Sequence, residues 1–120
     1  MLFFYFVVKT MNWLVDIDGT ICDDIRNEEW HLFLSARPLP GALKAMQKLE
    51  SRGTITYFTA RLPEHRSITV QWLKTYGFPC ADNVVCGKPR SNGQPYTWID
   101  NTPVTGVTFK GDWEQTLNII

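Results

Sequence analysis

The sequence has few cysteines and no apolar segment long enough to cross a membrane. Its three cysteines, Cys22, Cys80 and Cys86, are odd in number and lack Cys-x-x-Cys spacing, which argues against a disulfide framework and a tetrahedral zinc site. The apolar stretch at residues 2–8 has seven residues, whereas a membrane-spanning helix needs roughly 20. We therefore predict free thiols, a cytoplasmic location and no membrane partner.

An excess of charge of either sign is also missing. Lys and Arg together number 12, as do Asp and Glu, so the formal net charge is zero. This balance does not attract a polyanion, although a local basic cluster could still do so, and nucleic acid is therefore not the expected partner. At 120 residues with a 44% hydrophobic share, the chain fits one compact globular domain.

The start of the chain lacks the marks of a secretory signal, which needs a positive charge before its apolar run and a small-residue cleavage site after it. Met11 offers an alternative start, after which the sequence opens into MNWLVDID. We assign residues 1–11 to an N-terminal extension with no role in the chemistry and residues 12–120 to a single domain. Mass spectrometry that finds Met1 at the N-terminus of the native protein would disprove the alternative start.

Apolar patterning predicts strands that alternate with helices. Strands are expected at residues 12–16, 54–58, 83–86, 96–99 and 106–109, where apolar, β-branched or aromatic residues follow one another. Helices are expected at residues 41–52, from residue 63 to a stop signal at Gly77, and at residues 112–120. This alternation is typical of an α/β protein with a parallel sheet and right-handed crossovers.

Polar residues stand where the predicted strands end. Asp16 and Asp18 follow the first strand, Thr59 the second and Asp100 the fourth, and Lys88 comes shortly after the third. In open parallel sheets, ligands bind outside the carboxyl ends of the strands. The sequence therefore predicts a functional site at this edge of the sheet.

The two aspartates of the segment DIDGT, Asp16 and Asp18, point to the same side of an extended chain. Such a pair can divide its work, because one carboxylate stays ionised as a nucleophile while the other holds a proton for a leaving group. The alternative is a plain turn, since Asp-Gly is a common turn signal. That alternative explains Gly19 but not why an apolar strand ends in two acids.

Four short motifs occur in a fixed order along the chain: DIDGT at residues 16–20, YFTAR around Thr59, CGKP around Lys88 and YTWIDN around Asp100. In this order they resemble the motifs of the haloacid dehalogenase superfamily, whose hydrolytic members are mostly phosphatases. TAR followed by Arg66, and FKGDW near the C-terminus, resemble a group of small phosphatases without a cap domain, some associated with capsular polysaccharide synthesis. The resemblance covers the chain from about Asn12 onward. It implies a three-layer Rossmann-like sandwich around a parallel five-stranded sheet.

The resemblance also implies a role for each motif residue. Asp16 would attack phosphorus to form an aspartyl-phosphate, and Asp18 would protonate the leaving oxygen and then activate water. Thr59 and Lys88 would hold the transferred phosphoryl oxygens, in keeping with the need of phosphoryl transfer for positioning and charge compensation. Mg²⁺ would be held by the Asp16 carboxylate, the Asp18 backbone carbonyl and the Asp100 carboxylate, an oxygen set suited to this cation.

Asn101 departs from the family pattern, which often has a second acid after the aspartate of the fourth motif. An amide can accept a hydrogen bond from a metal-bound water, but it removes a negative charge from the site. We include Asn101 in the metal site and expect weaker magnesium binding without loss of activity.

Four other polar residues have competing interpretations. Arg61 and Arg66 could contact a second anionic group of the substrate, or Arg61 could form a structural salt bridge and Arg66 a solvated helix face. Asp112 competes with Asp100 for the metal but also suits the start of the last helix. His65 lacks a partner at metal-ligand spacing and receives no role. The tryptophans Trp13, Trp72 and Trp98 are expected to fill the core.

The spacing between motifs leaves no room for a cap domain, because residues 21–40 are too few to bury a core of their own. We therefore expect an open site that suits a phosphorylated substrate of bulky kind, unless the segment at residues 22–38 folds over it. Residues 29–34 could form a short helix against the core.

Other functions stay open at this stage. End-processing of nucleic acid, as in polynucleotide 3'-phosphatases, has a similar plan but little support from the charge balance. A catalytically silent binding protein is a second alternative, which the presence of Asp16, Asp18 and Lys88 disfavours. Dehalogenation is disfavoured, because that reaction has no oxygen leaving group for Asp18 to protonate.

Overall fold

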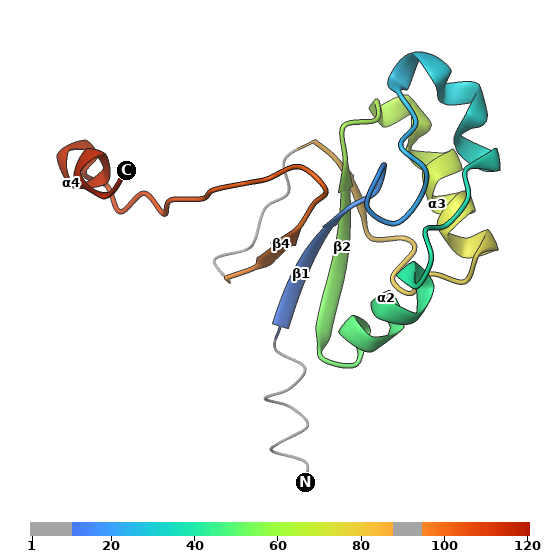
Figure 1. The fold of residues 1–120 in the computed structure, drawn as a ribbon, viewed down its shortest axis with the longest axis horizontal. Helices are drawn as coiled ribbons and strands as arrows, with labels where there is room; N and C mark the ends of the chain where they lie inside the picture. Colours follow the sequence, from blue (N-terminus) through green and yellow to red (C-terminus); the bar gives the residue numbers. More distant parts are fainter. Residues whose placement is uncertain (1–10, 88–94) are drawn as a thin grey trace, which may run out of the picture.

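The computed structural model describes residues 11–87 and 95–120. Within these residues, four strands, two 3₁₀ helices and three α-helices follow one another (Figure 1). In order they are β1 (Met11–Asp16), η1 (Asn27–Ser35), α2 (Ala42–Glu50), β2 (Gly53–Thr59), η2 (Pro63–His65), α3 (Arg66–Thr75), β3 (Val84–Cys86), β4 (Thr97–Ile99) and α4 (Trp113–Ile119). The strands predicted at residues 12–16, 54–58, 83–86 and 96–99 and the three predicted helices are confirmed, although no helix is described between β3 and β4.

The four strands form one sheet in the order β3-β2-β1-β4, and every pairing in it is parallel. Leu14 and Val15 of β1 are buried, as expected for a central strand with neighbours on both sides. At the N-terminal ends of the paired strands β1 and β2, Gly53 lies beside Met11. A Cβ atom at residue 53 would lie 1.9 Å from the Met11 carbonyl oxygen. Glycine is therefore required where β2 begins.

The strand predicted at residues 106–109 is wrong, because residues 103–110 form no strand. The described sheet consequently has four strands and not five. The physical reason lies in the connection: only residues 100–105 separate Ile99 from Gly106, and a crossover between neighbouring parallel strands needs a dozen or more residues. The local alternation of Val107 and Phe109 predicted the extended conformation but not a pairing partner.

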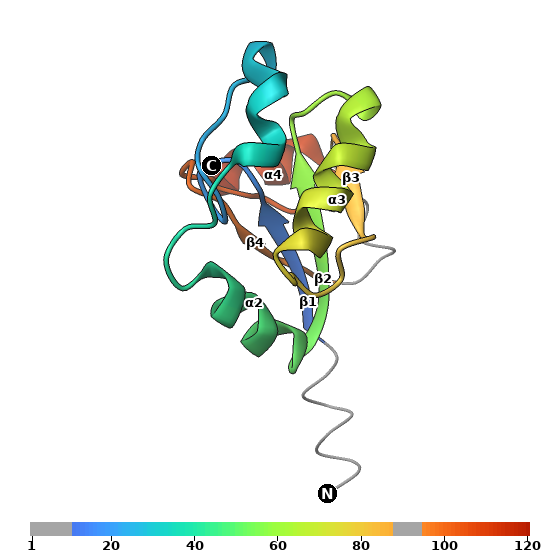
Figure 2. The ribbon, with the colours of Figure 1, turned by 90° about the vertical axis from the view of Figure 1, so that its right-hand side faces the viewer.

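The hydrophobic core lies between the sheet and the helices α2 and α3. Ile55 and Tyr57 of β2 pack there with Met46 of α2 and with Trp72 and Leu73 of α3. Figure 2 shows α2, α3 and η1 on the same side of the sheet, with α4 behind it. Within the described residues, helices therefore cover one face of the sheet closely, and the second helical layer of the expected sandwich is not packed against it.

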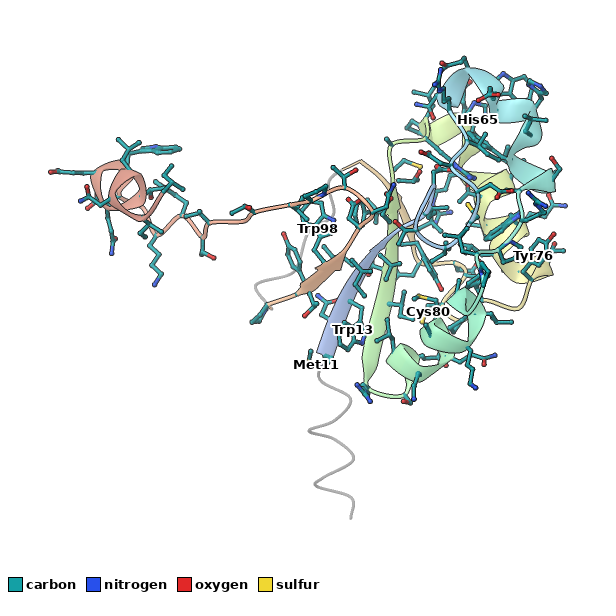
Figure 3. The ribbon with its side chains drawn as sticks, in the orientation of Figure 1. Met11, Trp13, His65, Tyr76, Cys80 and Trp98 are labelled. Carbon is teal, nitrogen blue, oxygen red and sulfur yellow. The ribbon has the colours of Figure 1, made fainter. Side chains whose placement is uncertain are left out.

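The three tryptophans of the predicted core differ in their surroundings, and Figure 3 labels two of them, Trp13 and Trp98. Trp72 is buried and donates through Nε1 to the Ala36 carbonyl oxygen at 2.9 Å. Trp13 is half-buried and donates to the Leu49 carbonyl oxygen at 3.1 Å, which ties β1 to α2. Trp98 corrects the prediction, because it is 40% exposed on the outermost strand.

The segment between β1 and α2 contains η1 and no further helix or strand, so the described residues hold no cap domain there. Its two ends are joined by backbone hydrogen bonds from Asp23 N to the Arg37 carbonyl oxygen and from Leu39 N to the Ile21 carbonyl oxygen. Phe33 is the buried residue of η1, which confirms the predicted short helix against the core.

None of the helices in the described part of the chain is long and apolar enough to cross a membrane.

Candidate active site

Three of the predicted site residues meet at the carboxyl edge of the sheet. Asp16 is the last residue of β1, Thr59 is the last residue of β2, and Asp100 follows β4 directly. Because Val15 pairs with Ile99, Asp16 and Asp100 leave neighbouring strands at the same level. The strand order places β1 between β2 and β4, so Asp16 occupies the middle of this edge.

The chain turns sharply directly after Asp16. Gly19 has a φ of +82°, a conformation that is costly for residues with a side chain. The turn is closed by hydrogen bonds from Thr20 N to the Ile17 carbonyl oxygen (3.1 Å) and from Gly19 N to the Cys22 carbonyl oxygen (3.0 Å). A Cβ atom at residue 19 would lie 2.6 Å from the Asn101 side-chain amide group. Gly19 therefore lets the turn approach the end of β4.

Asn101 and Thr20 connect the ends of β4 and β1. Thr20 Oγ1 donates to Asp16 Oδ2 at 3.1 Å and accepts from the Asn101 backbone N–H at 3.0 Å. The surrounding acceptors orient the Asn101 amide so that its nitrogen donates to Asp16 Oδ2 at 2.9 Å and to Asp100 Oδ1 at 3.1 Å. The Asp16 carboxylate is thus fixed through one of its oxygens by two donors.

The electrostatics of Asp16 are unusual for a carboxyl group. Burial and the negative charge of Asp100 raise the pKa of Asp16 from 3.8 to about 6, against the opposite effect of the Thr20 hydrogen bond. Asp100 is itself held in place by donors, the Trp98 indole N–H at 3.2 Å and the Thr102 backbone N–H at 2.9 Å. Asp16 and Asp100 are thus two acids bridged by the Asn101 amide, and a bound cation would reduce the repulsion between their charges.

Asp18 forms a tight pair with Arg61. The Arg61 Nε donates to Asp18 Oδ2 at 3.0 Å, and Nη2 donates to Asp18 Oδ1 at 2.7 Å, a bidentate geometry that adds orientation to charge attraction. The third nitrogen donates to Thr69 Oγ1 at 2.9 Å, and the guanidinium lies 3.7 Å from the centre of the Phe33 ring. The Arg61 side chain is 1% exposed.

This geometry fits the structural salt bridge that the sequence left open for Arg61. In the structure its guanidinium is engaged by Asp18, Thr69 and Phe33, and contact of Arg61 with a substrate stays a prediction. Both Asp18 oxygens accept hydrogen bonds from Arg61. In this structure the Asp18 carboxylate is therefore oriented toward the guanidinium.

Thr59 lies deep in the site and is 2% exposed. Its Oγ1 accepts a hydrogen bond from the Arg61 backbone N–H at 3.0 Å, which fixes the oxygen while the hydroxyl keeps its own proton as a donor. Lys88, the predicted cationic partner of Thr59, lies outside the described residues.

The remaining predicted candidates lie away from this edge. Arg66 donates to the Val84 carbonyl oxygen at 3.0 Å and to the Asp82 carbonyl oxygen at 2.7 Å, so it ties α3 to the start of β3. Asp112 is the N-cap of α4, where its Oδ1 accepts from the Glu114 and Gln115 backbone N–H groups. This is the capping interpretation of Asp112.

The oxygen donors of the site suit a hard divalent cation. No group of three or more His, Cys, Asp or Glu side chains converges in the part of the chain that the structure describes, but the expected set needs only the carboxylates of Asp16 and Asp100 with a backbone carbonyl. Burial and the negative charge of Asp100 raise the pKa of Asp16, and such a cation would offset the charge of both carboxylates. The residues therefore fit magnesium.

In this structure Asn101 forms hydrogen bonds to the site carboxylates. Its amide nitrogen, not its oxygen, is turned toward the carboxylates, so that it acts as a donor to the site. Its role as a metal ligand stays a prediction. Thr20, which bonds both Asp16 and Asn101, received no role from the sequence, although its place in DIDGT, two residues after Asp18, was a usable signal.

No family model matches the chain, but comparisons with curated proteins and with solved structures find partial similarities. Over 48 residues, the chain is 44% identical to a Bacillus cereus protein named "Putative nucleotidase", a match that covers 39% of this chain and 25% of that protein. The structure resembles that of the class C acid phosphatase from Bacillus anthracis, with a TM-score of 0.57, 21% identity and coverage of 68% of this chain and 42% of that chain. The matched region is therefore 25% of the Bacillus cereus protein and 42% of the Bacillus anthracis phosphatase chain. The structural likeness shows a shared α/β fold with a parallel sheet.

Proposed function

We propose that this chain is a magnesium-dependent phosphatase of the haloacid dehalogenase type that hydrolyses phosphate monoesters through an aspartyl-phosphate. The observation that carries the proposal is the meeting of Asp16, Thr59 and Asp100 at one strand edge, with Asp18 two residues beyond Asp16. The fold shared with an acid phosphatase and the similarity to a protein named as a nucleotidase support the same reaction class.

Asp16 is the nucleophile in this proposal. Its carboxylate is held at Oδ2 by Thr20 and Asn101, so that it meets a phosphate in one orientation, as in-line attack requires. A bond forms between an Asp16 oxygen and phosphorus while the bond from phosphorus to the leaving oxygen breaks. The Thr59 hydroxyl, fixed by the Arg61 backbone N–H, donates to a phosphoryl oxygen.

Asp18 acts as the general acid and then as the general base in this proposal. It gives a proton to the leaving oxygen, and it later takes one from the water that attacks the phosphoaspartate and returns Asp16 to its carboxylate form. Because Arg61 binds both Asp18 oxygens, the proposed reaction includes a rotation of Asp18 from the guanidinium toward the substrate.

Two further groups complete the proposed site. Magnesium would be held by Asp16, the Asp18 carbonyl and Asp100, with Asn101 beside it, and when bound it would supply the positive charge that lets an anionic nucleophile meet an anionic phosphate. Lys88 would contribute an ammonium group to the phosphoryl oxygens.

The substrate class proposed first is a nucleoside monophosphate. The 44% identity over 48 residues to a protein named as a nucleotidase favours it, and an open site without a cap domain would admit a substrate of this bulk. A panel of nucleoside monophosphates, sugar phosphates and phosphorylated oligonucleotide ends, each with magnesium, tests this choice. Preferred turnover of phosphorylated ends would instead favour nucleic-acid end-processing.

The reaction class is tested by turnover of an aryl phosphate in magnesium. We expect activity in the wild type, loss of it in Asp16→Asn, and retention in Asp112→Asn, which makes the same chemical change at the cap of α4. Hydroxylamine added during turnover should convert the phosphoaspartate to a hydroxamate at residue 16, detected by mass spectrometry. A wild type inactive on every phosphate would favour the silent binding protein.

A further inference from the structure

The face of the sheet opposite α2 and α3 carries a row of apolar side chains. Parallel pairing sets Leu14 of β1 level with Trp98 of β4, and the neighbouring strands contribute Phe58 and Val85, which also pair with each other. Side chains alternate between the two faces of a strand, and these four lie on the face opposite Tyr57 and Val84 of the core. We call this row the back face.

The back face is incompletely covered by the residues that the structure describes. Leu14 and Phe58 in the middle of the row are buried, but Trp98 at its end is 40% exposed and Val85 is half-buried. The Trp98 ring stands edge-on to Phe58, with 5.1 Å between the ring centres. All-parallel sheets occur almost only with both faces covered by helices, so this face calls for a helical layer.

The same chain contains a helix, α4, whose apolar side chains are largely exposed; within the described residues, Trp113 of this helix contacts Phe109, with 4.9 Å between the ring centres. Trp113 and Leu117 of α4 and Ile120 directly after it follow at spacings of four and three residues and are 67%, 65% and 72% exposed. The opposite side of this helix carries the polar residues Glu114, Gln115 and Asn118, and Ile119, which is 62% exposed, borders them. An amphipathic helix normally turns its apolar stripe toward a core, and the stripe of α4 faces solvent instead.

The connection to α4 explains why the chain does not cover its own back face. Residues 103–112, which we call the arm, form no helix or strand, and they hold α4 well away from the sheet (Figures 1 and 2). Ten extended residues span up to about 33 Å, enough to reach a neighbouring molecule. The formal net charge of zero provides no long-range repulsion between two copies.

The geometry points to a dimer in which two copies exchange their arms, and α4 of each copy packs its apolar stripe on the back face of the other. Such an exchange is reciprocal, because the same helix and the same sheet face serve on both molecules, so the assembly closes as a two-fold dimer. It covers the second face of the sheet and the stripe of α4 in one step. The inference does not depend on the proposed phosphatase activity.

The first test is the molar mass of the full chain, measured by light scattering after size-exclusion chromatography over the micromolar range. We expect twice the mass of the 13.8 kDa chain for the wild type and for Gln115→Asp, which places a charge on the polar side of α4. Leu117→Asp places the same charge on the apolar stripe and should give a single chain. Since Leu117 is exposed within one copy, its replacement should not prevent folding, which circular dichroism checks.

The second test distinguishes exchange from closure within one chain. A sample mixed from isotope-labelled and unlabelled copies should give isotope-filtered nuclear Overhauser effects between the Trp98 ring of one copy and the Leu117 methyl groups of another. A monomer at every concentration would overturn the inference, as would a dimer that survives Leu117→Asp. Contacts between Trp98 and Leu117 confined to one chain would overturn it as well.

Discussion

Replacement of the proposed nucleophile should stabilise the protein while it removes activity. The pKa of Asp16 is raised from 3.8 to about 6 by burial and by the charge of Asp100, so the ionised carboxylate is less favourable in the folded chain than in the unfolded chain. About two pKa units correspond to about 3 kcal/mol at most. Because the side chain is only half-buried, solvent screening reduces this cost to about 1–2 kcal/mol.

The cost depends on pH in a defined direction. Below the unfolded-state pKa of 3.8 the carboxyl group is protonated in both states and costs nothing, and above the folded-state pKa of about 6 it is ionised in both and costs the full amount. Asp16→Asn keeps an oxygen that can accept from Thr20 but carries no charge. Without magnesium the variant should therefore unfold about 3–8 °C higher than the wild type at pH 7.5, and near the same temperature at pH 4.

The measurement is thermal unfolding of both proteins in a chelating buffer at the two pH values. Asp23→Asn is the matched control, because hydrogen bonds from Arg37 lower the pKa of Asp23, so that its loss should not stabilise the protein at pH 7.5. Added magnesium should raise the unfolding temperature of the wild type more than that of Asp16→Asn. A variant that is less stable than the wild type at pH 7.5, or a difference that is the same at pH 4, would refute the reasoning.

Three further variants test the geometry around this carboxylate. Asn101→Asp exchanges an amide donor for a negative charge and should lower the magnesium concentration for half-maximal rate by about tenfold; an unchanged requirement in a magnesium titration would contradict this. Gly19→Ala should lower the free energy of unfolding by about 1–2 kcal/mol and remove most of the activity. The control Gly41→Ala has a similar φ of +80° but nothing within 4 Å of the added Cβ atom, so it should lower stability without loss of activity. Urea unfolding and a rate assay measure the two effects. Arg61→Lys should lose the bidentate contact and about 100-fold in kcat/KM, while Arg66→Lys, outside the site, should remain close to the wild type; equal losses would speak against a role for Arg61 in the site.

The strands and the site edge could be predicted from sequence because both depend on local information. A run such as Trp13 to Val15 favours a central strand whatever surrounds it, and the carboxyl ends of parallel strands meet without further specification. The prediction of a fifth strand was wrong because pairing also depends on the length of the connection after β4. The alternation of Val107 and Phe109 carries no information on that length. The prediction that Trp98 lies in the core was wrong for a related reason, because the exposure of Trp98 depends on whether a helix covers its face of the sheet.

The partners of the site side chains could not be predicted, because they depend on contacts between residues far apart in the chain. Arg61 reaches Asp18 across 43 positions and Asn101 reaches Thr20 across 81. A motif specifies which residue types stand at a strand end, but several orientations of a guanidinium or an amide are compatible with it. The surrounding acceptors select among them.

The two interpretations of Arg61 can be joined as successive states of one site. In the structure the guanidinium is bound to Asp18, and the proposed chemistry requires Asp18 to leave it. Once Asp18 turns toward a substrate, Arg61 retains Thr69 and Phe33 as partners but regains two donors, which an anionic group of the substrate can accept. Binding of such a group would then favour release of Asp18, so that the proton donor becomes available when a phosphate is present to use it.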